Sequence, residues 1–257
     1  MDSDKKEGTY SARSAPVTKG EHSDLHVAIS SPLGGVLYYY LKTDVQMPHS
    51  GCYVNVDGFS ETGYTYRSKD WMELNLSIEP GDHVIMWRAW SPAVSLSSTP
   101  VASGTIFLDE VSFQPVLIEG FEEGRLLWNS MTFIGFGEWT FDNSNASQGS
   151  SSFRSPSLQA GEYSVLSFEV TAPKRGSVLT FWYQASVWMP QDNFIFSING
   201  KPVILRESPS PGWESFGVAL TPGTSTLRWE YNKKSDVGTH GGEGAVWLDE
   251  ISIKPRS

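Results

Sequence analysis

Two runs of this chain follow one pattern, Gly104-Thr105-Ile106-Phe107-Leu108-Asp109-Glu110-Val111-Ser112-Phe113 and Gly244-Ala245-Val246-Trp247-Leu248-Asp249-Glu250-Ile251-Ser252-Ile253, and their acidic pairs lie 140 positions apart. Each run is largely apolar, carries an acidic pair, and is followed closely by a proline, Pro115 or Pro255. Runs rich in β-branched and aromatic residues are typical of buried strands. We interpret the two runs as the closing strands of two homologous modules.

The repeat continues upstream of these strands in a nearly constant register. Gly20-Glu21 and Gly161-Glu162 lie 141 positions apart, and several further pairs lie 142 apart. Those pairs are Gly34-Gly35 with Gly176-Ser177, Met47-Pro48 with Met189-Pro190, Asp57-Gly58 with Asn199-Gly200, Trp71 with Trp213, Pro80-Gly81 with Pro222-Gly223, and Trp87 with Trp229. Self-similarity at a fixed period indicates a duplicated unit. We therefore predict module 1 over residues 1–116 and module 2 over residues 117–257, joined by a short connector.

Module 1 lacks a counterpart for the opening of module 2. Module 2 begins with Ile118-Glu119-Gly120-Phe121-Glu122-Glu123-Gly124, whereas Met1 already corresponds to a position near 143. By the repeat, roughly 25 to 30 residues of module 2 have no match in module 1. In a β-sandwich such a gap exposes a sheet edge or leaves a groove. We expect the chain to be part of a larger polypeptide that extends further at its N-terminus.

The composition favours an all-β protein with two cores. The 257 residues are 39% hydrophobic and 13% aromatic, with 24 Gly and 15 Pro, which fits aromatic-rich strands separated by tight turns. The single cysteine, Cys52, has no partner for an intrachain disulfide. The net charge of −10 argues against nucleic acid and anionic lipid as partners. No apolar run is long enough to predict membrane insertion.

Alternating apolar side chains predict strands in both modules. In one strand Leu227, Trp229 and Tyr231 face one way, while Arg228 and Glu230 face the other. The predicted strands of module 1 are residues 27–29, 36–41, 53–56, 72–76, 83–90 and 105–113. Those of module 2 are residues 164–171, 178–184, 193–198, 214–219, 225–231 and 245–253. No segment shows a convincing helical period, so two antiparallel sandwiches in tandem are predicted.

The motifs of module 2 resemble those of a known family. They are Phe121-Glu122-Glu123-Gly124, Trp139, Leu179-Thr180-Phe181-Trp182-Tyr183, Phe194-Ile195-Phe196-Ser197-Ile198-Asn199-Gly200, Trp213, Pro222-Gly223-Thr224-Ser225-Thr226-Leu227-Arg228-Trp229-Glu230-Tyr231 and Trp247-Leu248-Asp249-Glu250-Ile251. In this order they resemble a MAM-like, cleaved-adhesin-like jelly-roll module. The resemblance covers module 2 and most of module 1, although module 1 lacks the Phe-Glu opening. It implies two tandem antiparallel jelly-roll β-sandwiches, an extracellular or cell-surface location, and adhesion or carbohydrate binding.

The resemblance also implies a structural calcium ion (Ca²⁺) in module 2. Its ligands would be Glu122 in the opening segment and Asp249 in the closing strand, because the first and last strands of a jelly roll commonly lie side by side. Calcium takes 6–8 oxygen ligands, which two carboxylates and backbone carbonyls supply. On a regular strand Asp249 shares its face with Trp247 and Ile251. The alternative is that Asp249 accepts hydrogen bonds from backbone amides or pairs with an arginine.

The candidate ligand-binding residues of module 2 are Trp188, Trp182, Asp236 and His240. Trp188 lies in an apparent loop, where a flat aromatic face is available to stack on a sugar, whereas Trp182 lies on a predicted strand. Asp236 and His240 belong to a polar, glycine-rich loop before the closing strand, and loops on rigid sandwiches commonly carry binding. The alternatives are core packing for the tryptophans and an ordinary connection for the loop. Trp139, Trp90, Tyr64 and Tyr66 are further candidates for stacking.

No catalytic motif is found in the sequence. None of the five histidines belongs to a zinc motif, and neither a G-x-S-x-G elbow nor a P-loop is present. We predict non-catalytic modules that bind a glycan or a cell-surface protein. Two alternatives stay open. One is a carbohydrate-active hydrolase or its accessory region, because a glycosidase needs only two suitably spaced carboxylates. The other is a set of structural spacer repeats.

Overall fold

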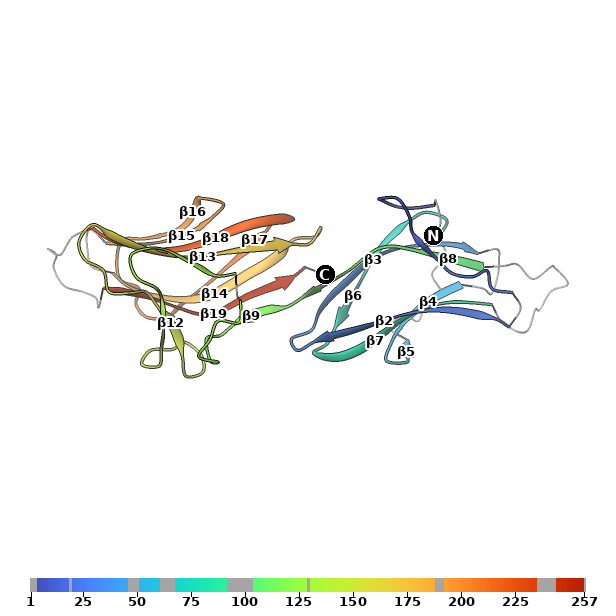
Figure 1. Cartoon of the computed structure of the whole chain (residues 1–257), viewed down its shortest axis with the longest axis horizontal. Helices are drawn as coiled ribbons and strands as arrows, with labels where there is room; N and C mark the ends of the chain where they lie inside the picture. The colour runs from blue at the N-terminus through green and yellow to red at the C-terminus, as the bar shows by residue number, and fades with distance from the viewer. Residues whose placement is uncertain are drawn as a thin grey trace. The chain divides into compact units, whose positions relative to one another are not determined.

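The computed structural model describes residues 4–18, 20–45, 51–60, 68–91, 104–128, 130–187, 192–234 and 244–256. Every regular element in these ranges is a β-strand. The chain divides into two compact units, which we continue to call module 1 (Met1–Pro115) and module 2 (Val116–Arg256). Within the described ranges there is no helix long and apolar enough to span a bilayer. Figure 1 shows each module as two facing layers of strands.

Module 1 is a sandwich of two antiparallel sheets. One sheet has the order β1-β8-β3-β6 and the other has the order β2-β7-β4-β5. The strands are β1 (Ala12–Arg13), β2 (His22–Ser31), β3 (Gly35–Val45), β4 (Gly51–Val56), β5 (Phe59–Ser60), β6 (Met72–Ile78), β7 (Gly81–Trp90) and β8 (Gly104–Pro115). Their inward side chains form one core that includes Leu37, Leu41, Val54, Ile85 and Trp87.

Module 2 repeats this arrangement and adds strands to it. One sheet has the order β10-β13-β18-β15-β16, and the other has the order β11-β12-β19-β14-β17, with β9 also paired to β19. The strands are β9 (Leu117–Glu119), β10 (Thr132–Gly135), β11 (Thr140–Asp142), β12 (Ser152–Arg154), β13 (Glu162–Ala172), β14 (Ser177–Ser186), β15 (Asn193–Ile198), β16 (Lys201–Arg206), β17 (Glu214–Leu220), β18 (Gly223–Lys233) and β19 (Ala245–Pro255). The prediction of two antiparallel sandwiches is therefore confirmed.

All the predicted strands lie inside observed strands, and the predicted facing is confirmed where the alternation was clear. Leu227, Trp229 and Tyr231 of β18 are fully buried in the core of module 2. Fully burying a large apolar side chain contributes about 1.5–3 kcal/mol. The sequence prediction omitted the short strands β1, β5, β9, β10, β11, β12 and β16. These have two to six residues each, and none of them shows a clear alternation of apolar and polar side chains.

A β-bulge interrupts each closing strand immediately after its aspartate. In β19 the pairing with β14 shifts between Thr180 and Trp182, and Glu250 has a φ of 48°. In β8 the pairing with β3 shifts in the same place, and Glu110 also has a φ of 48°. The extra residue reverses the alternation. Ile251 therefore lies in the core together with Leu248, and the prediction that it shares a face with Asp249 was wrong.

Both predicted hairpin turns adopt the expected backbone. Asp57-Gly58 has φ values of 53° and 85°, and Asn199-Gly200 has φ values of 52° and 75°. Two successive residues with positive φ define the type I′ turn, which matches the twist of the strands it joins. The side chains of both turn residues also accept a backbone hydrogen bond. Asp57 Oδ1 accepts from Val84 N at 2.8 Å, and Asn199 Oδ1 accepts from Thr226 N at 2.8 Å.

The modules differ at one flank. In module 2, β13 is covered along its outer edge by β10, which pairs Thr132 to Gly135 with Ser164 to Ser167. In module 1 the equivalent strand is β2, and among the described residues it pairs with β7 alone. The predicted exposed sheet edge is therefore present in the described part of module 1.

Candidate functional site

Asp249 is fully buried and accepts backbone hydrogen bonds. Its Oδ2 accepts from the amides of Ser147 at 2.8 Å and Gln148 at 3.0 Å, and its Oδ1 accepts from the amide of Glu250 at 2.8 Å. Burial raises the pKa of this carboxyl above its ordinary value, and the amides of Gln148, Ser147 and Glu250 oppose that rise. Asp249 thus fastens the segment before β12 to the closing strand.

Glu122 holds the same segment two residues further along. Its two carboxylate oxygens accept from the amide of Ser150 at 3.0 and 3.1 Å, from the Ser150 hydroxyl at 2.7 Å and from the amide of Ser151 at 3.0 Å. The Ser150 hydroxyl and amide hold the pKa of Glu122 below its ordinary value. Gly149 has a φ of 60°, so a side chain there would strain the backbone, and its Cβ would displace the Glu122 carboxylate.

The two predicted calcium ligands, Glu122 and Asp249, therefore both accept hydrogen bonds from one short segment, residues 147–151. The described residues contain no group of three or more His, Cys, Asp or Glu side chains arranged to hold a metal ion. A cation and an amide hydrogen compete for the same carboxylate lone pairs. Calcium at Glu122 and Asp249 would thus replace amide contacts that this conformation already makes. The hydrogen bonds of the alternative interpretation are present, and calcium binding stays a prediction.

Glu119 is a buried carboxylate that the sequence analysis did not identify. It has no exposed surface, and it accepts from the amides of Phe121 at 3.1 Å, Leu127 at 2.6 Å and Trp128 at 3.4 Å. Burial raises its pKa, and these amides oppose the rise. The only feature of the sequence that could have identified Glu119 is its position directly before Gly120-Phe121. Glu119 shapes the opening loop of module 2 and has no access to a ligand.

The structure locates only part of the predicted ligand site of module 2. Trp182 is half-buried on the outward face of β14 and pairs with Asp249 of β19 and Ser215 of β17. Trp188, Asp236 and His240 lie outside the described residues, as do Tyr64 and Tyr66. Trp139 is only 2% exposed and belongs to the core, which is the alternative stated for the tryptophans.

A different surface gathers polar and aromatic side chains, the outward face of sheet β2-β7-β4-β5 in module 1. Arg88 of β7 lies at its centre, and neighbouring strands place Asp24 and Tyr53 beside it. Arg88 donates to both Asp24 oxygens, at 2.7 Å from Nε and 2.5 Å from Nη2, and to the Tyr53 hydroxyl at 3.0 Å from Nη1. Its guanidinium carbon also lies 5.8 Å from the centre of the Tyr53 ring.

Two histidines and a tryptophan surround this centre. The Nε2 atoms of His22 and His26 each lie 3.9 Å from Asp24 Oδ2. Trp90 pairs with His22 across the sheet, and its indole nitrogen is buried without a hydrogen-bond partner among the described residues. Hydrogen bonding to Arg88 holds the pKa of Asp24 below its ordinary value. The carboxylate and guanidinium are thus a fixed ion pair at the surface.

Two open hollows meet at Arg88. One has a volume of about 500 Å³ and is lined by His26, Asn55, Asp57, Gly58, Val84, Met86 and Arg88. The other has a volume of about 450 Å³ and is lined by Gly20, Glu21, His22, Tyr53, Arg88, Trp90 and Ser91. The two hollows share Arg88, and together they are hereafter called the Arg88 trough. Its residues come from β2, β4 and β7 and from the turns and loops next to these strands, which lie far apart in the sequence.

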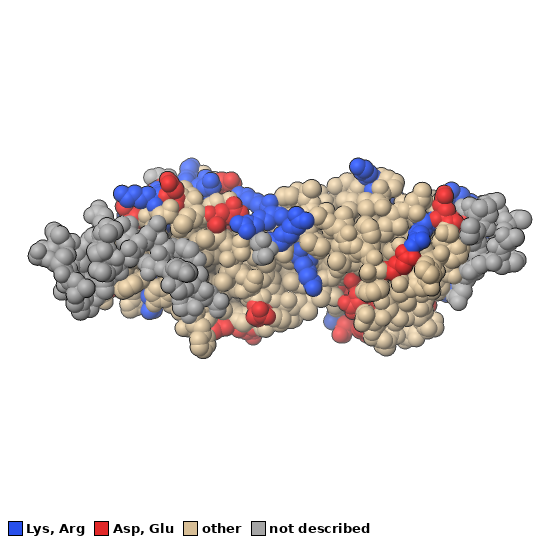
Figure 2. All heavy atoms as spheres, turned by 180° about the vertical axis from the view of Figure 1, so that it is seen from behind, with Lys and Arg blue, Asp and Glu red and all other residues tan. Residues whose placement is uncertain are grey.

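The equivalent face of module 2 carries different chemistry. By the repeat, Glu230 takes the place of Arg88 and Asn232 takes the place of Trp90. There Arg228 donates to Glu230 at 3.3 Å, and Asn232 donates to Glu230 at 2.8 Å and to Asn193 at 2.9 Å. Figure 2 shows acidic and basic side chains interspersed with wide uncharged areas on one face of the chain.

No protein-family model and no curated protein matches the sequence. Among solved structures, the chain is similar to the K1 cleaved adhesin domain of Lys-gingipain from Porphyromonas gingivalis W83, at 18% identity and a TM-score of 0.42, over 55% of this chain and 99% of that chain. It is similar to the tandem CBM22-1–CBM22-2 domain of Paenibacillus barcinonensis Xyn10C, at 13% identity and a TM-score of 0.40, over 98% and 88%. It is also similar to a CBM61 module solved with β-1,4-galactotriose, at 15% identity and a TM-score of 0.40, over 54% and 95%.

Proposed function

We propose that this chain is a non-catalytic glycan-binding protein and that the Arg88 trough of module 1 is its binding surface. The observation that carries the proposal is the position of Arg88. It is held rigid by Asp24 and Tyr53, yet it forms the common wall of two adjoining hollows. A side chain fixed in this way presents polar atoms to a ligand without losing further conformational entropy on binding.

The residues of the trough suit the chemistry of sugars. Sugar hydroxyls both donate and accept hydrogen bonds, and Arg88, Asp24 and Asn55 supply donors and acceptors in fixed positions. Trp90 and Tyr53 add aromatic faces, which pack against the apolar face of a pyranose ring. Since two hollows share one wall, the trough fits an oligosaccharide of at least two residues better than a single sugar.

The state of Asp24 favours binding over hydrolysis. A glycosidase needs one carboxylic acid with a raised pKa to protonate the leaving group. Arg88 instead lowers the pKa of Asp24, which keeps this carboxylate ionised at neutral pH. A carboxylate in a bidentate ion pair orients a ligand and is a poor proton donor.

The test is a glycan array with the full chain, followed by calorimetric titration of the best oligosaccharide. We expect Trp90→Ala to weaken binding at least tenfold and Arg88→Ala to abolish it. The matched control is Asn232→Ala, which changes the equivalent position of module 2 and leaves affinity unchanged. A reducing-end assay on the same oligosaccharide is expected to detect no products. Absence of binding to every glycan would contradict the proposal and favour a spacer, and released sugar would favour a hydrolase.

Two further parts of the proposal concern context. The Arg88 trough and the outward Trp182 face differ in chemistry, so a second ligand site at Trp182, Trp188, Asp236 and His240 is proposed for module 2. Trp188→Ala should weaken binding there without lowering the melting temperature.

We also propose that the chain acts outside the cell or at its surface, within a larger polypeptide. Detection of the native protein on intact cells with an antibody tests that location.

A further inference from the structure

Module 2 shows how the flank of this sandwich is normally closed. Strand β10 pairs with β13 and turns Phe133 inward beside Leu166, which has no exposed surface. On the opposite sheet Phe153 of β12 completes the flank, and its ring centre lies 6.1 Å from that of Phe133 and 4.9 Å from that of Phe121. The opening segment of module 2 therefore supplies aromatic side chains that seal its core.

The described residues of module 1 form the same backbone frame without that seal. Leu25 pairs with Trp87 as Leu166 pairs with Trp229, so Leu25 is the counterpart of Leu166. Leu25 is nevertheless 41% exposed. Val111 of β8, the counterpart of Ile251, is 40% exposed, whereas Ile251 is fully buried. Two core positions are thus uncovered at one flank.

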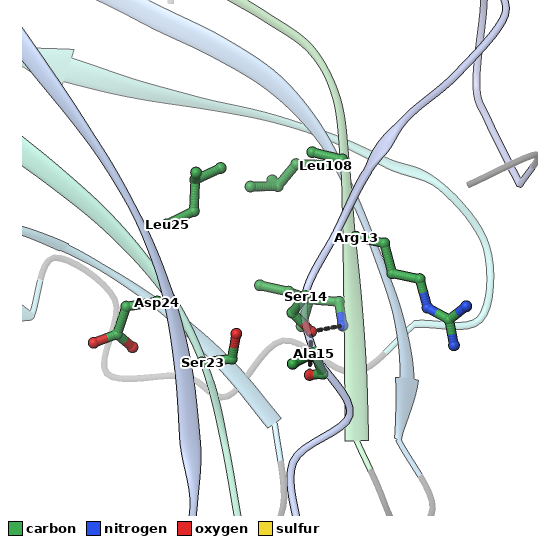
Figure 3. A pocket seen from close by; sticks show the side chains of 9 residues that line it. Arg13, Ser14, Ala15, Ser23, Asp24, Leu25 and Leu108 are labelled. Carbon is green, nitrogen blue, oxygen red and sulfur yellow. Dashed lines mark hydrogen bonds between the residues drawn. The ribbon is translucent and has the colours of Figure 1, made fainter. Parts of the chain in front are cut away.

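A cavity lies at the position of the missing seal. It has a volume of about 140 Å³, and its apolar lining includes Leu25, Ile106, Leu108 and Ala12. Ala12 pairs with Leu108 as Phe153 pairs with Leu248, so an alanine stands where module 2 has an aromatic ring. Figure 3 shows Leu25 and Leu108 pointing into the same space from the two sheets. An apolar cavity of about 150 Å³ is large enough to hold a benzene ring.

We propose that the edge of β2 binds an extended peptide strand, and that this strand is an opening segment of the same repeat, with the chemistry seen in module 2. The strand pairs antiparallel with residues 23–26 as β10 pairs with Ser164 to Ser167. Its counterpart of Phe133 enters the cavity between Leu25 and Leu108. The backbone hydrogen bonds give affinity and the cavity gives specificity, as in other cases of strand addition to a sheet edge. The internal duplication indicates which peptide binds at this edge, because in module 2 the equivalent edge is already paired with β10 and its Phe133.

The test uses the full chain and a labelled synthetic peptide of residues 125–137. We expect saturable binding by fluorescence anisotropy, with affinity reduced at least tenfold by Leu25→Arg in the protein or by Phe133→Asp in the peptide. Leu33→Arg is the matched control, since Leu33 is a 43% exposed leucine of module 1 that lies away from the cavity. Equal affinity for Leu25→Arg and wild type would overturn the proposal.

Cys52 provides an independent readout inside module 1. It is the only cysteine of the chain, has no exposed surface, and has its pKa raised by burial to about 12. It therefore reacts with a thiol reagent only when module 1 opens. We expect bound peptide, or residues 117–142 fused ahead of residue 4, to slow this reaction at least tenfold in mild denaturant. If neither the free peptide nor the fusion slows it, the edge of β2 is not a strand-binding site.

Discussion

Asp109 and Asp249 hold equivalent backbone amides in the two modules. Asp109 Oδ2 accepts from Lys6 N at 2.8 Å and Glu7 N at 3.1 Å, and its Oδ1 accepts from Glu110 N at 2.8 Å. Asp249 makes the same three contacts with residues 141 and 140 positions later in the chain. The aspartate of each acidic pair therefore joins two parts of its module. It holds the segment before the first long strand against the closing strand.

Replacing Asp249 should destabilise module 2 more than replacing Asp109 destabilises module 1. Asp249→Ala leaves partly buried amides without an acceptor, each at a cost of about 1–3 kcal/mol, so a total loss of about 2–5 kcal/mol is expected. The amides of Lys6 and Glu7 are exposed and water can replace the carboxylate, so Asp109→Ala should cost about 1 kcal/mol or less. Urea unfolding of the full chain measures both. Equal losses would show that burial does not set the cost.

Gly149→Ala should destabilise module 2 in a way that depends on Glu122. The alanine pays about 1–2 kcal/mol for its left-handed backbone and also collides with the Glu122 carboxylate. Gly124→Ala is the control, since Gly124 has a φ of 62° and no atom lies within 4 Å of the place that a Cβ would take, so it should lose only the backbone contribution. Adding Glu122→Ala should bring the loss at Gly149 down to that of the control. An unchanged loss in the double variant would exclude the collision.

Calcium binding at Glu122 and Asp249 makes a prediction that the amide contacts alone do not. An ion that binds the folded state at 100 times its dissociation constant adds about 2.7 kcal/mol. The melting temperature of module 2 should then rise by several degrees in calcium relative to chelator. The rise should vanish in Glu122→Ala and in Asp249→Ala. Identical melting of the wild-type chain in both buffers would leave the two acids as amide acceptors only.

His83 should make the stability of module 1 depend on pH. Its Nδ1 lies 2.7 Å from Asp57 Oδ2, and this contact raises the pKa of His83 above 6.5. The stabilisation is fully present below pH 6.5 and is lost as the pH rises through the higher folded-state pKa. NMR titration of the full chain should show one histidine that titrates high and returns to an ordinary value in Asp57→Asn. That variant copies the Asn199 turn of module 2, so the hairpin is retained. A titration unchanged by the substitution would rule out the pair.

Much of the fold could be predicted because duplication and alternation are both written in the sequence. The long strands β14 and β18 alternate clearly, and the constant period transferred that assignment to β3 and β7. The bulges could not be predicted, because a glutamate with positive φ leaves no local signal. The resulting error was specific, since one extra residue at Glu250 moved Ile251 from the face of Asp249 into the core.

The candidate site was less accessible to sequence reasoning. Trp90 was considered for stacking, but Arg88, Asp24 and Tyr53 were not. Asp24 and Tyr53 lie 64 and 35 positions from Arg88, and only the order β2-β7-β4 brings them together. Glu122 and Asp249 were identified because the repeat singles out the closing strand. Their shared amide segment depends on the path of residues 147–151, which side-chain pattern does not reveal.

The bulge in each closing strand decides which later side chains of that strand face the core and which face water. If β19 ran through Glu250 as a regular strand with no bulge, Ser252 and Lys254 would turn toward the core, and Ile251 and Ile253 would turn toward water. The two faces of β8 would be exchanged in the same way after Asp109. A single-residue insertion or deletion in the regular part of either closing strand is therefore expected to be more damaging than deletion of the bulged glutamate itself. In both copies the acidic pair marks the residue at which a bulge turns the rest of the strand back toward the core.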